Sequence, residues 1–276
     1  MNDPQEFIER ASRFIKQQRD MYGDFSVDIE SQSVVAAEKE EAGTAAVSKE
    51  VSHSSEVKKS PATSKGSDAI TPEEKEQKEE PLTTAQKIAR CETLEELRAL
   101  CEQAEELHTD LKGTNLVFGV GNPNANLMIV GEAPGYNEDQ QGEPFVGQAG
   151  QLLDKIMAAI NFERKDIYIA NILKHRPPNN RNPKAEERER SLPFLLRQIE
   201  LIDPKLILCV GKVSATTLLD KETSLSNLRG KFHEFHGREL MATYHPAALL
   251  RNQQWKRPTW EDVQKLRKRY DELVGE

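Results

Sequence analysis

The pattern of apolar and polar positions is clearest at residues 126–160, where three kinds of segment follow one another. An apolar run at residues 127–130 leads into a polar loop that is rich in glycine, proline and carboxylates. From Val146 onward, apolar residues return at the spacing of one helix face. The pattern predicts a strand, a loop and a helix, the arrangement in which α/β proteins bind ligands beyond the carboxyl end of a strand.

Strands and helices continue to alternate through the rest of the chain. Apolar runs predict strands at residues 116–118, 167–173, 205–210, 232–235 and 239–243, the last two turning at Gly237. Helical spacing predicts helices at residues 85–108, 184–202, 213–219 and 259–274, with Thr259 as the N-cap of the last. This order indicates a three-layer α/β/α domain on a mainly parallel central sheet, spanning residues 85–276.

The first 84 residues have a different pattern. Residues 1–27 predict a short amphipathic helix with Phe7, Phe14 and Ile15 on its apolar face. Such a helix either packs back on the domain or docks a protein partner, and the first reading is slightly favoured because nothing identifies a partner. Residues 28–84 predict a disordered polar linker, because their Ser, Ala, Thr, Glu and Lys cannot bury enough apolar surface to fold.

The charge of the chain is unevenly distributed. Of the formal net charge of -8, most belongs to residues 1–85, which carry 11 Lys and Arg against 18 Asp and Glu. The remaining residues are nearly neutral, so the acidic composition does not exclude a nucleic-acid partner for the domain. The three cysteines form no CxxC pair, no signal peptide opens the chain, and no apolar run reaches membrane-spanning length. These features predict a cytoplasmic protein with no membrane partner.

Polar residues of informative types stand at the ends of three predicted strands: Glu132 after the first, Asn171 within the next, and His245 after the last. Because parallel strands end at one edge of a sheet, these side chains can converge there with Phe145 of the polar loop. Each alone is ordinary in a turn or a cap. As a set they suit a flat polar ring: the amide reads its edge, the aromatic stacks on it, the carboxylate orients water and the imidazole supports a developing oxyanion.

Loop cations surround this set, namely Lys174, Arg176, Arg181, Arg251, Lys256 and Arg257. They are either ordinary solubilising charges or contacts for nucleic-acid phosphates. The pair Leu249 and Leu250 is either helix core or an apolar wedge for a base stack, and spacing alone does not decide between the two.

Three segments in order strongly resemble family-four uracil-DNA glycosylases. The first is GEAPG at 131–135 with Glu138-Asp139 and GEPFVGQAG at 142–150, the second is YIAN at 168–171 with RPPNNR at 176–181, and the third is HPAALLRN at 245–252. The likeness extends over residues 94–266. It implies the uracil-DNA glycosylase fold and hydrolysis of the N-glycosidic bond of deoxyuridine in DNA, which leaves an abasic site in base excision repair.

The resemblance assigns two residues to the chemistry. It implies that Glu132 orients or activates the attacking water and that His245 hydrogen-bonds the departing uracil anion. Glu138 and Asp139 lie on the same loop and either assist with the water or bind backbone amides.

Other residues are assigned to binding. The resemblance implies that Phe145 stacks on the flipped uracil and Asn171 reads its amide edge, with Gly131 and Ala133 beside them in the substrate site. It also implies that Leu249 fills the gap that the flipped uracil leaves in the DNA duplex. The predicted DNA contacts are Leu249, Arg251, Arg176 and Lys174.

The chain departs from the family pattern at the iron–sulfur cluster. The family holds a four-iron–four-sulfur cluster on four cysteines, of which only Cys101 is present here. Ala104, His175 and Ser191 stand at the other three positions. One thiolate and one imidazole cannot hold such a cluster. We therefore expect a member without metal or redox cofactor, in which His175 is a structural or phosphate-facing residue.

Two other functions stay open from the sequence. One is a non-catalytic module that binds uracil-containing or single-stranded DNA, or a protein partner. The other is a glycosylase for a different deaminated base. The complete set of Glu132, Asn171 and His245 favours an enzyme, and the amide of Asn171 favours uracil.

Overall fold

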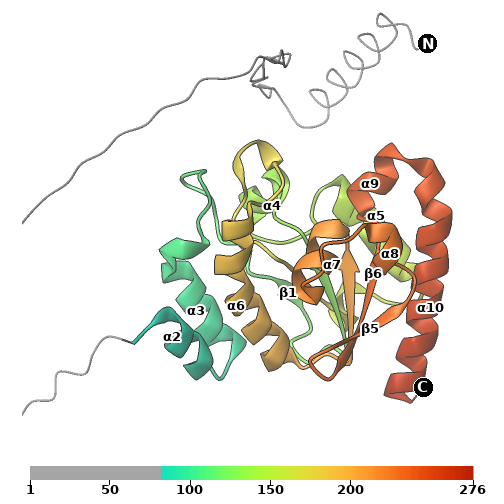
Figure 1. The fold of residues 1–276 in the computed structure, drawn as a ribbon, viewed down its shortest axis with the longest axis horizontal. Coiled ribbons are helices and arrows are strands. Elements are labelled where there is room, and N and C mark those ends of the chain that lie inside the picture. The colour runs from blue at the N-terminus through green and yellow to red at the C-terminus, as the bar shows by residue number, and fades with distance from the viewer. Residues whose placement is uncertain (1–81, 276) are drawn as a thin grey trace, which may run out of the picture. The chain divides into compact units, whose positions relative to one another are not determined.

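The computed structural model describes residues 82–275, which fold around a six-stranded sheet (Figure 1). The predicted N-terminal helix, and residues 28–81 of the predicted linker, lie outside the described residues. The strands are β1 Val120–Gly121, β2 Leu127–Gly131, β3 Tyr168–Asn171, β4 Leu206–Val210, β5 Phe232–Phe235 and β6 Arg238–Thr243. The strand predicted at residues 116–118 is wrong, because Val117 donates its N–H to Lys174 in the loop after β3 rather than to a strand.

The centre of the sheet is parallel. The strand order is β1-β3-β2-β4-β6-β5, and only the edge strands β1 and β5 run antiparallel to their neighbours. The register pairs Gly131 with Asn171, and Val210 with Thr243. The four parallel strands therefore end on one side of the sheet, which we call the carboxyl edge. The predicted mainly parallel sheet is confirmed.

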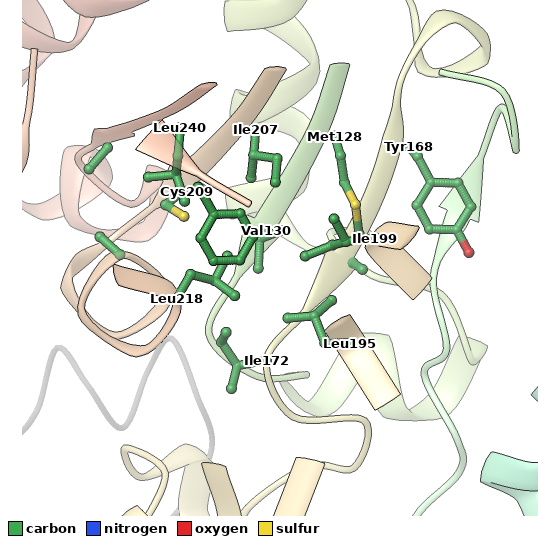
Figure 2. Packing of buried hydrophobic residues seen from close by; sticks show 14 of the residues in the cluster. Met128, Val130, Tyr168, Ile172, Leu195, Ile199, Ile207, Cys209, Leu218 and Leu240 are labelled. Carbon is green, nitrogen blue, oxygen red and sulfur yellow. The ribbon is translucent and has the colours of Figure 1, made fainter. Parts of the chain in front are cut away.

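One face of the sheet packs against α6 (Ala185–Ile202) and α7 (Lys212–Leu219). Val130 and Cys209 point to this side and belong to the same core as Leu195 of α6 (Figure 2). All three side chains are fully buried or nearly so, as expected for parallel strands covered by helices.

The opposite face packs against α5 (Gln148–Ala158) and α10 (Lys256–Val274). Ile129 and Leu208, the sequence neighbours of Val130 and Cys209, point to this side because successive side chains of a strand alternate. Helices on both faces confirm the three-layer α/β/α fold. The shorter helices are α4 Tyr136–Gln141, α8 Leu225–Leu228 and α9 Pro246–Arg251, with 3-10 turns η2 Arg164–Asp166, η3 Pro178–Asn180 and η4 Gln253–Trp255.

The segment predicted as one helix at 85–108 forms α2 (Thr84–Arg90), α3 (Leu94–Gln103) and the 3-10 turn η1 (Glu105–Leu107). The break comes at Thr93, whose hydroxyl accepts the N–H of Glu96 in a capping box that starts a new helix. These helices pack on the outer side of α6 through a separate small core.

Two other expectations need correction. The loop after β2 contains α4, which lacks the apolar periodicity that would reveal a helix. The last helix starts at Lys256, so Thr259 lies inside it and is not its N-cap. Pro258 fits the first turn, where its missing N–H has no partner to lose, and the Thr259 hydroxyl donates to the Trp255 carbonyl at 2.8 Å. Among residues 82–275, no helix combines the length and apolar character needed to cross a membrane.

Candidate active site

Gly131 brings together two of the predicted site residues at the carboxyl edge. It pairs with Asn171 across β2 and β3. A Cβ atom at this position would lie 2.3 Å from Asn171 Oδ1 and 2.6 Å from Phe145 Cζ, distances that no real side chain tolerates. The residue is therefore glycine because an amide and an aromatic ring both approach its Cα. The sequence placed these three residues in one site, and the structure does the same.

Asn171 is buried, with 2% of its surface exposed, and is held by its main chain. Its carbonyl oxygen accepts a hydrogen bond from Lys174 Nζ at 3.3 Å. Its side-chain oxygen Oδ1, in contrast, is buried with no hydrogen-bond partner among the described residues. An unsatisfied buried acceptor costs on the order of 1–3 kcal/mol. Such a group is ready to accept a hydrogen bond from a ligand that enters the site.

The backbone at Phe145 is strained and tightly held. Its φ of 56° lies in the left-handed region, which costs a residue other than glycine about 1–3 kcal/mol. A Cβ on Gly150 would lie 1.7 Å from the Phe145 carbonyl oxygen, so this helix residue must be glycine. Arg164 Nη2 donates to the same oxygen at 2.6 Å, and Arg164 Nε donates to Asp154 at 2.8 Å. These contacts fix the ring against the carboxyl edge.

His245 caps α9 and faces Phe145, with the two ring centroids 5.5 Å apart. Its Nδ1 accepts the backbone N–H of Ala247 at 3.1 Å. Burial, together with the nearby charge of Arg251, lowers the pKa of His245 to about 4. The ring is therefore neutral at pH 7. Because Nδ1 is an acceptor, Nε2 carries the proton and is a hydrogen-bond donor.

The three loop carboxylates have different surroundings. Glu138 accepts the N–H groups of Val146 and Gly147, each at 3.0 Å. Asp139 accepts the N–H of Asn115 at 2.8 Å. Both carboxylates therefore hold the loop by binding backbone amides, which is one of the two alternatives that the sequence left open.

Glu132 is the carboxylate that remains for chemistry. It is half-buried, and no hydrogen bond is made by its carboxylate within residues 82–275. Burial raises the pKa of Glu132, and the charge of Arg188 partly opposes this effect. A desolvated carboxylate beside Gly131 is suited to accept a proton. The side chain of Ala133 is partly buried and packs against the core on the α6 and α7 side of the sheet.

Two of the residues predicted to contact DNA, Lys174 and Leu249, are buried in this structure. Lys174 has no exposed surface, and its ammonium donates to Gln198 Oε1 at 2.7 Å and to the Phe118 carbonyl at 3.1 Å. It cannot reach a phosphate. Leu249 is 1% exposed, whereas Leu250 beside it is 40% exposed. A helix turns by about 100° per residue, so only one of the two leucines can point outward, and it is Leu250.

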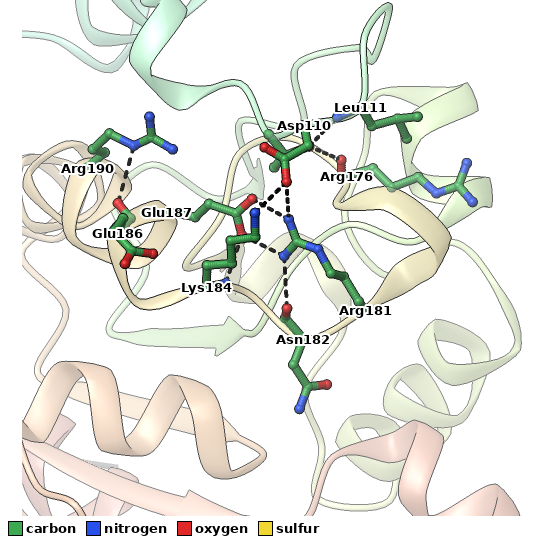
Figure 3. Close-up of polar contacts among 10 residues, drawn as sticks. Asp110, Leu111, Arg176, Arg181, Asn182, Lys184, Glu186, Glu187 and Arg190 are labelled. Carbon is green, nitrogen blue, oxygen red and sulfur yellow. Dashed lines mark hydrogen bonds and ion pairs between the residues drawn. The ribbon is translucent and has the colours of Figure 1, made fainter. Parts of the chain in front are cut away.

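The other predicted cations differ in how they are paired. Arg181 binds Glu187 at 2.6 Å and Asp110 at 3.2 Å, within a cluster of opposite charges after β3 (Figure 3). Arg176 has no acidic partner in the described part of the chain, and its Nε donates to Asn180 at 2.7 Å. Arg251 is exposed on α9. Of these, Arg176 and Arg251 remain candidates for contact with DNA.

The four positions that correspond to cluster ligands are all buried. Cys101, Ala104, His175 and Ser191 are all 5% exposed or less. Ser191 donates its hydroxyl to the Ile172 carbonyl at 2.7 Å. An iron–sulfur cluster needs thiolate ligands. These positions do not fit one, because they offer one thiol, one methyl group, one imidazole and one hydroxyl that is already hydrogen-bonded.

His175 has a structural setting. Its Nδ1 lies 3.0 Å from the Thr114 hydroxyl, and its ring stacks on His108 with centroids 4.1 Å apart. Burial lowers the pKa of His175 to about 4, and His108 adds to the effect. Of the two alternatives from the sequence, the structural one fits a ring that is 3% exposed. Its Nε2 is buried without a hydrogen-bond partner in the described chain, but no group of three or more His, Cys, Asp or Glu residues there could hold a metal ion.

Comparison with known sequences gives consistent matches. Residues 118–266 match the family described as the uracil DNA glycosylase superfamily. The chain is 46% identical over 161 residues to the type-4 uracil-DNA glycosylase of Archaeoglobus fulgidus, covering 55% of this chain and 81% of that protein. It is 40% identical over 161 residues to the type-4 enzyme of Thermotoga maritima, covering 57% and 84%. A type-5 uracil-DNA glycosylase of Pyrobaculum aerophilum is 27% identical over 146 residues, covering 47% and 64%.

Proposed function

Because the chain belongs to the uracil DNA glycosylase superfamily and matches its type-4 members, we propose that it is a monofunctional uracil-DNA glycosylase. It hydrolyses the bond between uracil N1 and C1′ of the deoxyribose, releases uracil and leaves an abasic site in DNA. The observation that carries this proposal is the buried, unpartnered Oδ1 of Asn171 next to Gly131 and Phe145.

The amide of Asn171 matches the edge of uracil. Uracil presents an N3–H donor beside the O4 acceptor, and an amide presents an acceptor beside a donor. Asn171 Oδ1 accepts N3–H, and Nδ2 donates to O4. Cytosine presents an acceptor at N3 and a donor at N4, which would leave both buried groups of Asn171 unpaired. Unpaired buried groups are the strongest basis for rejecting a wrong ligand.

His245 stabilises the leaving group. As the glycosidic bond breaks, its electron pair moves to N1 and the negative charge spreads to the carbonyl oxygens of the base. The neutral Nε2–H of His245 donates to such an oxygen, and this hydrogen bond strengthens as charge develops. Its fixed tautomer, set by the Ala247 N–H, means that no proton must be rearranged before the reaction.

Glu132 serves the attacking water. The water oxygen forms a bond to C1′ as N1 departs, and the carboxylate accepts a hydrogen bond from the water and then its proton. The stacking of Phe145 holds the base in plane with Asn171. The base reaches this site only after it leaves the DNA stack, which costs least for single-stranded or mispaired uracil.

We also propose that the reaction needs no iron–sulfur cluster. The residues proposed for chemistry, Glu132 and His245, are separate from the four cluster positions, and those positions carry only one thiol. Of the predicted contacts to DNA, Arg176 and Arg251 are kept in this proposal. The exposed Leu250 takes the place of the buried Leu249, and the buried Lys174 is left out. A DNA substrate is consistent with action in the cytoplasm. The proposed protein partner of the N-terminal helix stays a prediction outside the described residues.

The test is cleavage of labelled oligonucleotides that carry one uracil, one hypoxanthine or one thymine opposite guanine, followed by alkali. We expect strand scission at uracil only, in the presence of EDTA. Scission at hypoxanthine instead would assign the enzyme to another deaminated base. Tight binding of the uracil oligonucleotide without scission would make the protein a reader of DNA and overturn the proposal.

A further inference from the structure

Tyr136 is exposed in a position where packing does not explain it. With 55% of its surface accessible, it is the most exposed large apolar side chain of residues 82–275. It opens α4, directly after the loop that follows Gly131. The ring belongs to none of the three apolar cores. An exposed aromatic at the rim of a binding site is a common contact for a partner molecule.

Arg176 holds the Tyr136 ring from a second loop. Its guanidinium carbon lies 5.0 Å from the ring centroid, a distance at which a cation and an aromatic face attract. Arg176 Nε donates to Asn180 Oδ1 at 2.7 Å, which fixes the plane of the guanidinium. The Arg176 carbonyl accepts the hydroxyl of Thr109 at 2.7 Å, which fixes the loop itself. The pair is therefore built in place before any ligand arrives.

The charge of Arg176 is not neutralised, in contrast to its neighbours. Arg181 and Lys184 are bound to Asp110, and Arg181 also to Glu187. Figure 3 shows the side chain of Arg176 pointing away from this cluster. No carboxylate pairs with Arg176 in the part of the chain that the structure describes. The pair thus offers an aromatic face and a positive charge side by side.

The position of the pair relates it to the proposed uracil site. Tyr136 follows Gly131 by five residues, and Arg176 follows Asn171 by five residues. Gly131 and Asn171 are themselves paired at the carboxyl edge. Five residues span at most about 17 Å, so the Cα atoms of Tyr136 and Arg176 lie no farther than this from those of Gly131 and Asn171. A strand whose uracil enters the site has its neighbouring nucleotide near this rim.

We propose that Tyr136, supported by Arg176, is a stacking subsite for the base of a nucleotide next to the uracil. The inference rests on the proposed function, because that function supplies the DNA strand. The base stacks on the open face of the ring, and the guanidinium strengthens the ring–base contact and attracts the adjoining phosphate. Stacking of this kind accepts any base, because every base has an aromatic face, and it requires a base that is not already stacked in a duplex. The subsite therefore favours single-stranded or locally opened DNA.

The test is a double-mutant cycle that removes the Tyr136 ring and the neighbouring DNA base, separately and together. Wild type, Tyr136→Ala and Tyr136→Phe are compared on single-stranded oligonucleotides with one uracil. One oligonucleotide is intact, and two others carry a tetrahydrofuran abasic residue on the 5′ or the 3′ side of the uracil. We expect Tyr136→Ala to lower kcat/KM for the intact strand on the order of tenfold and to match wild type on one of the two abasic strands. Tyr136→Phe, which keeps the ring, should match wild type throughout.

Two results would overturn the subsite. One is an equal loss for Tyr136→Ala on all three strands, which would mean a structural role for the ring. The other is no loss on any strand. If the wild-type protein released no uracil at all, the proposed function would fail, and fluorescence anisotropy of the same strands and variants would still decide whether the ring stacks on a base.

Discussion

The ammonium nitrogen of Lys174 lies 3.3 Å from the carbonyl oxygen of Asn171 and donates a hydrogen bond to it from a fully buried position. The same ammonium binds Gln198, whose Nε2 donates to the hydroxyl of Tyr168 at 2.9 Å. Burial lowers the pKa of Lys174 to about 8, so the group is still mostly charged at pH 7. A charged donor in the interior thus positions the main chain of the residue proposed to read the base.

Replacing Lys174 by Met should therefore misplace Asn171. The change removes the ammonium donor of the buried Asn171 carbonyl and of Gln198 Oε1, at a cost of roughly 1–3 kcal/mol each. The Phe118 carbonyl keeps a hydrogen bond from Gln198 Nε2 at 3.2 Å. We expect a lower Tm and at least a tenfold loss of kcat/KM for uracil release. Leu266→Ala, in the core under α10, is the matched control because it destabilises the fold without touching Asn171. If both variants lost activity equally at 25 °C, the positioning role of Lys174 would be excluded.

Replacing Asn171 by Asp tests the reading of the base edge. The carboxylate keeps the acceptor that faces N3–H but loses the donor for O4, and it adds a charge to a buried site. We expect uracil release to fall by at least 100-fold, with less discrimination between uracil and cytosine. Single-turnover rates on oligonucleotides with either base measure both effects. A wild-type rate with wild-type selectivity would remove Asn171 from the site.

His245→Ala removes the donor to the leaving group. Losing one such donor typically costs a factor of about 10²–10³ in kcat. Binding of uracil-containing DNA should change much less, because the hydrogen bond strengthens only as charge develops. Single-turnover rates and anisotropy on the same oligonucleotide separate the two quantities. Equal losses in rate and binding would indicate a docking role for His245.

Gly131→Ala tests the convergence of Asn171 and Phe145. The new methyl group would lie 2.3 Å from Asn171 Oδ1, so the amide and the ring must move apart. We expect loss of nearly all activity in a protein that still folds. Gly147→Ala is the control on the same segment. The atoms nearest to its Cβ would belong to the side chains of Asn137, at 3.1 Å, and Glu138, at 3.5 Å, rather than to the backbone, and its φ of -77° suits alanine. Similar activities of the two variants would contradict the geometry.

The pKa of His175 makes stability depend on pH. Burial holds it near 4 in the folded chain, below the ordinary value of 6.5. Between these pH values the unfolded chain binds a proton at His175 that the folded chain does not. The contribution of His175 to the free energy of unfolding is therefore fully present above pH 6.5 and is lost as the pH drops toward 4. Urea unfolding at pH 7.5, 5.5 and 4.5 should show a smaller fall for His175→Gln than for wild type. Identical falls would mean that His175 is not buried in a neutral form.

The sequence predicted the sheet and the convergence of four candidate site residues because both leave strong local signals. Apolar runs mark buried parallel strands, and motifs at strand ends bring Gly131, Phe145, Asn171 and His245 to one edge. The polar helix α4 left no such signal, since its six residues contain no apolar period.

Side-chain direction was the part that the sequence could not supply. A lysine after a strand reads as a surface charge, and only the acceptors around Lys174, contributed by distant segments, reveal that it is buried. Leu249 and Leu250 differ only in helix phase, which depends on where α9 starts. The strain at Phe145 follows from Gly150 and Arg164, two residues that no single motif connects to it.

The proposed function requires that this chain release uracil from DNA through His245 and Asn171 with no iron–sulfur cluster. The most direct measurement is uracil release, by mass spectrometry, from a single-uracil oligonucleotide by protein purified from iron-rich cultures, with iron and sulfide determined in the same sample. We predict a colourless protein with less than one iron per ten chains that releases uracil stoichiometrically, and a His245→Ala variant slowed by about 10²–10³-fold. A brown protein with about four irons per chain would show that the cluster is present after all. A colourless protein that binds the oligonucleotide and releases nothing would show that it is not a glycosylase.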